Sequence, residues 1–119
     1  MRVLYIEDDP NNRLLVRRIL MAEGFQVLEA ENATQGINLA LQDPPDLILM
    51  DISMPGVDGL TATRQIRSLP QIAHLKIIAL TANAMTGDRE MILKAGCDGY
   101  ISKPINIDTF VDELRQFTS

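Results

Sequence analysis

The sequence predicts an α/β fold, a doubly wound (βα)5 three-layer sandwich around a parallel five-stranded sheet. Three runs of four apolar residues carry no charge, which is typical of strands that helices bury on both faces. Helical patterns separate these runs, so strand and helix alternate along the chain. No repeat, low-complexity tract or Gly/Ser/Pro linker divides the 119 residues, a length that suits one hydrophobic core. We therefore expect residues 1–119 to form a single domain.

Five segments are expected to form the sheet. The uncharged runs at residues 3–6, 47–50 and 77–80 predict central strands. The more polar segment 25–29 and the short segment 99–101 predict the edges. Parallel neighbours need right-handed crossovers, and placing the weakest strands outside gives the flavodoxin-like strand order 2-1-3-4-5.

Helix signals lie between the predicted strands. Asp9 followed by Pro10 is a good start, with a capping residue before proline, and Gly24 is a stop. Further helices are expected after Asn32 or Thr34, at about residues 59–68, at about residues 86–95 and near the C-terminus. The apolar residues at helical spacing, expected to face the sheet, are Leu15, Ile19, Ala22, Ala33, Ile37, Ala40, Leu41, Ala62, Ile66, Leu69, Ile107, Phe110, Val111, Leu114 and Phe117.

Composition excludes several classes of protein. The net charge of −5 argues against a nucleic-acid partner, because phosphate contacts need clustered Lys and Arg. A single cysteine, Cys97, cannot form an intrachain disulfide or a thiolate metal site, and we expect it to be a buried or half-buried residue. No apolar stretch approaches the roughly 20 residues of a membrane helix. The first apolar run stops at Glu7, too soon for a signal peptide, so we expect a soluble cytoplasmic protein with no membrane partner.

Residues with charged or hydroxyl side chains follow the ends of the predicted strands. In open α/β sheets the ligand site lies at the carboxyl ends of the strands. Glu7 and Asp8 follow the first strand, Asp51 follows the third, and Thr81 follows the fourth. The fifth strand is followed by Ser102 and Lys103. We therefore expect several carboxylates, a hydroxyl and an amine to meet at one rim of the sheet.

Crowded carboxylates repel one another, and a divalent cation removes the conflict. Hard oxygen ligands predict Mg²⁺, and the single histidine, His74, precedes the fourth strand at the opposite end of the sheet. An aspartate beside Mg²⁺ is a competent nucleophile toward phosphorus. Lys103 would neutralise charge on the transferring group, and Thr81 would donate a hydrogen bond to it.

Each of these residues alone also has an ordinary structural explanation. Glu7, Asp8 and Asp9 could cap the first helix, and Asp9 is the expected cap. Asp51 could be a turn residue, Thr81 a strand end and Lys103 a solvated loop residue. Their joint placement at one rim is what indicates a site.

Four segments together resemble a known family. Residues 5–10, 45–59, 80–82 and 96–104 are similar, in order and spacing, to the response-regulator receiver domain of two-component signalling. The resemblance covers essentially the whole chain. Residues 83–88 further resemble single-domain regulators of the DivK type and receivers attached to hybrid kinases.

The resemblance implies a phosphorylation site and a metal site. Asp51 would be the phosphoacceptor, phosphorylated by a histidine kinase or a phosphotransfer protein to give an aspartyl phosphate. Glu7, Asp8 and Asp51 would hold Mg²⁺, and the backbone carbonyl of Ser53 would complete the protein ligands. Glu7 departs from the commoner aspartate of the family.

The resemblance also implies a switch. Thr81 would be the switch hydroxyl and Tyr100 the switch aromatic, which rotates when Thr81 moves toward the phosphoryl group. The surface of helix 4, strand 5 and helix 5 would then change its affinity for a partner. Lys103 would contact the phosphoryl group, and the bond between Lys103 and Pro104 is expected to be cis.

Two further positions are implied to tune the lifetime of the phosphoryl group. Ser53 lies two residues after Asp51, and Asn83 two after Thr81, where they would flank the path of attacking water. No turnover of an external substrate is expected.

Output is expected through contact with a downstream protein, because the chain ends soon after the fifth helix. The protein would be a monomer or weak dimer, either a stand-alone regulator or a receiver from a hybrid kinase. Arg13 and Arg17, four residues apart on the first helix, form either a solvated face or a docking surface for an acidic partner.

Two other classes stay open from the residues alone. One is a Mg²⁺-dependent phosphatase or phosphotransferase of the haloacid dehalogenase type with an Asp nucleophile. Such enzymes carry a general acid two residues after the nucleophile, where this chain has Ser53. The other is a flavodoxin-like FMN carrier, whose phosphate loop would have to be the acidic segment 7–10.

Overall fold

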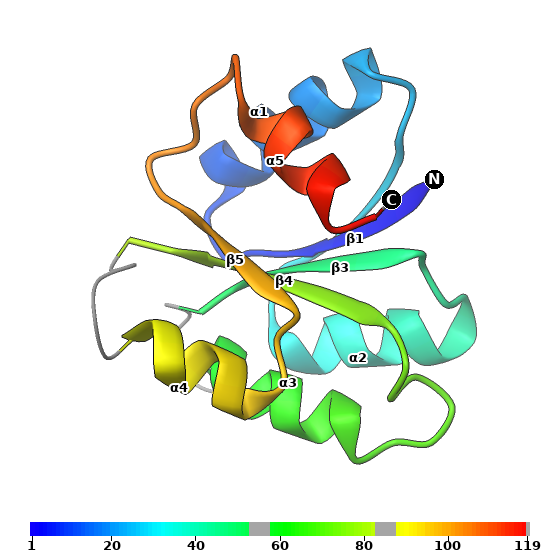
Figure 1. The fold of residues 1–119 in the computed structure, drawn as a ribbon. Helices are drawn as coiled ribbons and strands as arrows, with labels where there is room; N and C mark the ends of the chain where they lie inside the picture. Colours follow the sequence, from blue (N-terminus) through cyan, green and yellow to red (C-terminus); the bar gives the residue numbers. More distant parts are fainter. Residues whose placement is uncertain (53–57, 83–87, 119) are drawn as a thin grey trace.

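The chain folds into a five-stranded parallel sheet between two layers of helices (Figure 1). The computed structural model describes residues 1–52, 58–82 and 88–118. Within these residues the strands run in the order β2-β1-β3-β4-β5, which confirms the predicted fold and strand order. The strands are β1 (Arg2–Ile6), β2 (Gln26–Ala30), β3 (Leu47–Asp51), β4 (Lys76–Thr81) and β5 (Gly99–Ser102). The helices are α1 (Pro10–Ala22), α2 (Ala33–Gln42), α3 (Gly59–Arg67), α4 (Asp88–Ala95) and α5 (Phe110–Gln116).

Helices cover both faces of the sheet. In Figure 1, α1 and α5 lie on one face, and α2, α3 and α4 lie on the other. Side chains alternate between the faces along each strand, so Leu47 and Leu49 pack toward α1 and α5 while Ile48 and Met50 pack toward the other layer. Every residue of β3 is buried, which explains why its sequence is an unbroken apolar run.

Helix starts follow their predicted caps. The side chain of Asp9 accepts a hydrogen bond from the backbone N–H of Asn11 at 2.8 Å, and Pro10 is the first helical residue of α1. Asn32, not Thr34, caps α2 by accepting from the N–H of Gln35. The predicted start of α4 at about residue 86 lies outside the described residues.

The buried face of α1 differs from the prediction. Val16 and Leu20 are buried, whereas Leu15 is 37% exposed and Ala22 is exposed as well. Leu15 and Ala22 are seven residues apart, and Val16 and Leu20 are four apart. Each pair therefore lies on one side of a helix, and the sequence alone does not show which side faces the sheet. The path of α1 back across the sheet decides between them.

Two other predicted core residues lie at the surface. Leu41 in α2 is exposed, and the buried positions of that helix include Gly36 instead. Ile107 is 63% exposed because it precedes α5, whose N-cap is Thr109. The apolar stripe of α5 is therefore shorter than its sequence suggests.

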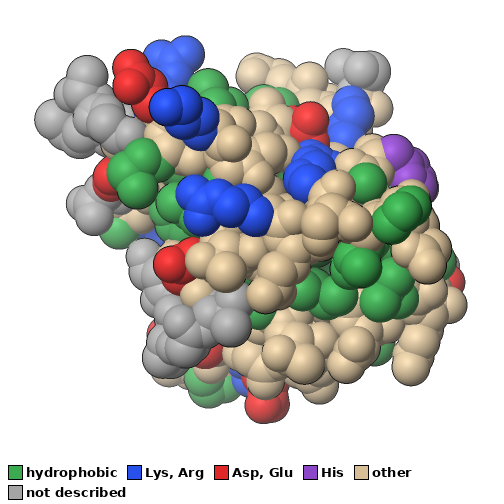
Figure 2. Space-filling model, turned by 90° about the horizontal axis from the view of Figure 1, so that it is seen from below, with side chains coloured by type: hydrophobic (Ala, Val, Ile, Leu, Met, Phe, Trp, Pro, Cys, Tyr) green, Lys and Arg blue, Asp and Glu red, His purple; other side chains and the backbone are tan. Residues whose placement is uncertain are grey.

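Basic side chains gather on one part of the face that α2, α3 and α4 form, as Figure 2 shows from below, and α2 itself contributes none. Those contributed by α3 and α4 are Arg64, Arg67, Arg89 and Lys94. Arg67 is half-buried, while the other three are exposed. None of the helices in the described ranges is both long and apolar enough to cross a membrane.

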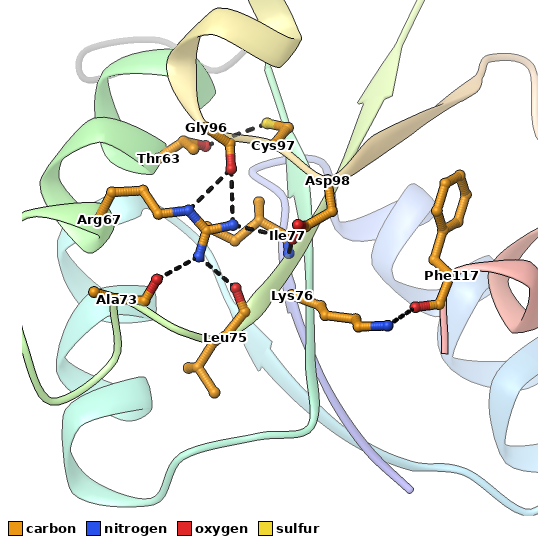
Figure 3. Close-up of polar contacts among 10 residues, drawn as sticks. All are labelled: Thr63, Arg67, Ala73, Leu75, Lys76, Ile77, Gly96, Cys97, Asp98 and Phe117. Carbon is orange, nitrogen blue, oxygen red and sulfur yellow. Dashed lines mark hydrogen bonds and ion pairs between the residues drawn. The ribbon is translucent and has the colours of Figure 1, made fainter. Parts of the chain in front are cut away.

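Arg67 joins three segments near the start of β4 and β5 (Figure 3). Its Nε and Nη2 atoms donate to the carbonyl of Gly96 at 2.9 and 2.7 Å. Nη1 donates to the carbonyls of Ala73 at 2.8 Å and Leu75 at 2.5 Å. Nη2 also pairs with the Asp98 carboxylate at 3.0 Å. One guanidinium thus ties the end of α3 to the loops before β4 and β5.

Replacing Arg67 with methionine is expected to lower the free energy of unfolding by about 3 kcal/mol, because part-buried carbonyls lose their donors. Urea unfolding followed by circular dichroism measures the change. Arg64→Met, an exposed arginine in the same last turn of α3, is the control and should shift stability by less than about 0.5 kcal/mol. Equal losses in the two variants would contradict the role of the network.

Candidate functional site

The carboxyl ends of the strands bring the predicted site residues to one rim. Glu7 follows β1, Asp51 ends β3 and Thr81 ends β4. These three side chains are almost completely buried, with exposed fractions of 1%, 2% and 2%. Asp8 is exposed beside them, and Glu7, Asp8 and Asp51 each offer a carboxylate oxygen within 4.8 Å of the others. The rim predicted from the sequence exists.

Lys103 is the cation of this cluster. Its Nζ atom donates to Asp51 Oδ1 at 2.9 Å and lies 3.6 Å from Glu7 Oε1. Its backbone N–H donates to the carbonyl of Thr81 at 2.7 Å, which fixes the start of the loop after β5. Burial by itself lowers the pKa of Lys103, but the hydrogen bond to Asp51 and the charges of Asp51 and Glu7 outweigh it. The pKa of Lys103 is raised, so the amine stays charged.

Glu7 is held unevenly. Its Oε1 atom accepts hydrogen bonds from the hydroxyl of Tyr5 at 3.1 Å and from the side-chain amide of Asn12 at 3.0 Å. Its Oε2 atom is buried and has no donor among the described residues. Burial raises the pKa of Glu7 to about 7, and the side-chain interaction with Asp51 and the charge of Asp51 add to that rise. Burial and the neighbouring Glu7 also raise the pKa of the Tyr5 hydroxyl.

These residues fit a divalent cation. A buried carboxylate oxygen without a donor is costly, and two carboxylates this close repel one another once both are ionised. Asp8 adds a third oxygen at the open side of the cluster. An oxygen-only donor set with one exposed edge suits Mg²⁺, which binds one or two carboxylates and keeps several waters.

Without a metal, the protein is expected to lose stability as the pH rises from about 4.5 toward 7. The pKa of Glu7 is higher in the folded chain than its ordinary value of 4.5, so protonated Glu7 favours the folded state and the benefit disappears as Glu7 ionises. Urea midpoints measured in EDTA between pH 5 and pH 8 test this. Glu7→Gln should flatten this part of the profile, and Mg²⁺ should restore stability at pH 8. A rise in stability across this range in the parent would contradict the assignment.

Comparison with known proteins identifies the family. Residues 3–115 match the response regulator receiver domain. The chain belongs to the response regulator receiver domain family. It is similar to the polar-differentiation response regulators DivK of Brucella anthropi, 38% identical over 115 residues, and Brucella ovis, 37% identical. In both comparisons the match covers 97% of this chain and 94% of the relative.

Solved structures agree with this assignment. The receiver domain of sensor histidine kinase PA1611 from Pseudomonas aeruginosa, with a magnesium ion coordinated in its active-site cleft, is 36% identical. It superposes with a TM-score of 0.89 over 98% of this chain and 96% of that one. The chemotaxis protein CheY4 of Vibrio cholerae, 24% identical, shares the fold with a TM-score of 0.92 over 98% and 97% of the two chains.

The other predicted residues of this receiver domain are distributed more widely. Tyr100 lies half-buried in β5, away from the carboxylates, and lines a groove with Leu93 of α4 and Phe117 after α5. The bond between Lys103 and Pro104 is cis. The two residues expected to tune phosphoryl lifetime and to complete the metal site, Ser53 and Asn83, lie outside the described residues.

The two α1 arginines of this receiver domain have partners within the chain. Arg13 donates to the backbone carbonyl of Glu7 at 2.7 Å and lies 3.7 Å from Glu31. Arg17 pairs with Glu29 at 3.3 Å. Arg13 therefore supports the site from within, in addition to any contact it makes with a partner.

Sequence reasoning missed three residues that shape the site. Tyr5 and Asn12 bind Glu7, and the strand period hints at the first because Tyr5 and Glu7 are two residues apart. Gly59 begins α3 against the end of β3, where an added Cβ would lie 2.5 Å from the carbonyl oxygen of Asp51. Because that neighbour is backbone and cannot move aside, only glycine allows α3 to begin so close to Asp51.

Proposed function

We propose that this receiver domain is a response regulator of a histidine-to-aspartate phosphorelay, phosphorylated on Asp51 with Mg²⁺. The observation that carries the proposal is the buried Asp51 carboxylate, which lies among Glu7, Asp8 and the amine of Lys103 at the carboxyl ends of the strands. A histidine kinase or phosphotransfer protein would supply the phosphoryl group.

Each residue of the rim has a role in this proposal. Glu7, Asp8 and Asp51 would hold Mg²⁺ with the backbone carbonyl of Ser53, and the ion would supply positive charge for the transferring phosphoryl group. The similar receiver domain from Pseudomonas aeruginosa has a magnesium ion coordinated in its active-site cleft, which supports Mg²⁺ as the cation here. Lys103 would contact the phosphoryl oxygens after transfer, since it already binds the Asp51 carboxylate.

The signal would reach the α4, β5 and α5 surface. The Thr81 hydroxyl would move toward an aspartyl phosphate, and Tyr100 would rotate into the space behind it. The groove that Leu93, Tyr100 and Phe117 line would then present a different surface to a downstream protein. Ser53 and Asn83 would set the lifetime of the phosphoryl group.

The proposal includes no turnover of an external substrate. Phosphatases with an Asp nucleophile place a general acid two residues later, and this chain has Ser53 at that position. Asp51 would therefore store the phosphoryl group and lose it slowly. An FMN carrier is disfavoured because the loop after β1 begins with Glu7 and Asp8, which would repel the FMN phosphate.

Intact-protein mass spectrometry after incubation with acetyl phosphate and Mg²⁺ tests the proposal. We expect a gain of one phosphoryl group that is absent when EDTA removes the metal. Peptide mapping after borohydride reduction should place the modification on Asp51. A protein that gains no mass with Mg²⁺ and acetyl phosphate would contradict the proposed function.

A further inference from the structure

The two oxygens of the Glu7 carboxylate have opposite surroundings. Oε1 accepts from Tyr5 and Asn12, and the Lys103 amine lies 3.6 Å away. Oε2 has no donor among the described residues, although it is as fully enclosed as the rest of the side chain. The carboxylate therefore has one occupied oxygen and one available oxygen.

The groups that hold Oε1 are themselves rigidly placed. Tyr5 is completely buried in β1, in the core beneath α1 and α5. Asn12 lies in the first turn of α1, which the Asp9 cap starts. The Glu7 backbone is also held, because its N–H donates to Ala30 at 3.0 Å. Turning the carboxylate to offer both oxygens to one ion would break the bonds from Tyr5 and Asn12.

This restraint bears on which cation the site accepts. Mg²⁺ requires near-octahedral geometry and takes single oxygens from carboxylates, whereas Ca²⁺ accepts six to eight ligands and often takes both oxygens of one carboxylate. We propose that Tyr5 and Asn12 are positioning residues that restrict Glu7 to one metal-facing oxygen and thereby favour Mg²⁺ over Ca²⁺. The inference rests on the proposed binding of Mg²⁺.

Calorimetric titrations of the full chain with MgCl₂ and with CaCl₂ test it. Tyr5→Phe keeps the ring and removes only the hydroxyl, and Asn12→Ala removes the amide from the α1 surface. Each is expected to reduce the ratio of Mg²⁺ to Ca²⁺ affinity about fivefold, mainly by weakening Mg²⁺. Asn11→Ala, at an exposed neighbouring position on α1, is the control and should leave the ratio within twofold of the parent.

A double-mutant cycle separates orientation from loss of stability. In a Glu7→Asp background the shorter carboxylate does not reach the Tyr5 hydroxyl, so Tyr5→Phe should no longer change the affinity ratio. If Tyr5→Phe folds poorly by circular dichroism, Asn12→Ala carries the same test. A ratio unchanged in every folded variant, or equal losses for both ions, would overturn the inference while leaving Mg²⁺ binding intact. A parent that binds no Mg²⁺ would instead overturn the proposed metal site and this inference with it.

Discussion

Asp51→Asn is expected to abolish phosphoryl uptake altogether. The asparagine amide is nearly isosteric but is not a nucleophile toward phosphorus, and no second carboxylate takes its position at the end of β3. The change also removes the negative charge that helps to raise the pKa of Glu7, so that pKa should fall toward its ordinary value. The variant should therefore be folded and unable to accept a phosphoryl group.

The measurement is the mass of the intact protein after incubation with acetyl phosphate and Mg²⁺. Asp58→Asn provides a matched control, because Asp58 caps α3 and asparagine caps helices equally well. We expect one phosphoryl group on the parent and on Asp58→Asn, and none on Asp51→Asn. A mass gain that persists in Asp51→Asn would assign the acceptor to another residue.

Lys103→Met is expected to slow phosphoryl uptake about a hundredfold and, at the same time, to tighten Mg²⁺ binding. The amine binds Asp51 Oδ1 directly, so its loss removes a positive charge from the place where negative charge develops on the transferring group. The same loss leaves Glu7 and Asp51 without their cation, which makes the cluster more attractive to Mg²⁺.

A slower rate of phosphoryl uptake together with tighter Mg²⁺ binding would distinguish a direct role of Lys103 in transfer from a structural one. The initial rate of mass gain with acetyl phosphate measures transfer, and calorimetry with MgCl₂ measures affinity. Lys94→Met, an exposed lysine at the end of α4, should match the parent in both assays. Weaker Mg²⁺ binding together with slower uptake would show that Lys103 supports the fold of the site instead of its chemistry.

Local patterns were sufficient for most of the fold. Uncharged runs identified the central strands because side chains buried on both faces of a sheet are apolar at every position, as in β3. Asp9 and Asn32 marked helix starts because a cap acts on backbone N–H groups two or three residues away. The buried face of a helix was harder to predict. Leu15 and Val16 in α1 both belong to apolar stripes at helical spacing, but only Val16 is buried in the core.

The same division applies to the site. Asp51, Thr81 and Lys103 could be assigned to one rim from sequence, because parallel strands place their carboxyl ends together and each residue directly follows or ends a strand. The role of Arg67 could not be predicted, since its partners lie 6 to 31 residues away and three of them are backbone carbonyls.

The position of Asp51 at the rim was thus determined by the sequence itself, because Asp51 stands at the end of a buried strand. Only the tertiary structure decided that Tyr5 and Asn12 meet on one oxygen of Glu7 and leave the other available. The physical reason is the distance along the chain over which each effect acts. Strand and helix periods act over a few residues, whereas the orientation of a buried carboxylate depends on how α1 packs against β1.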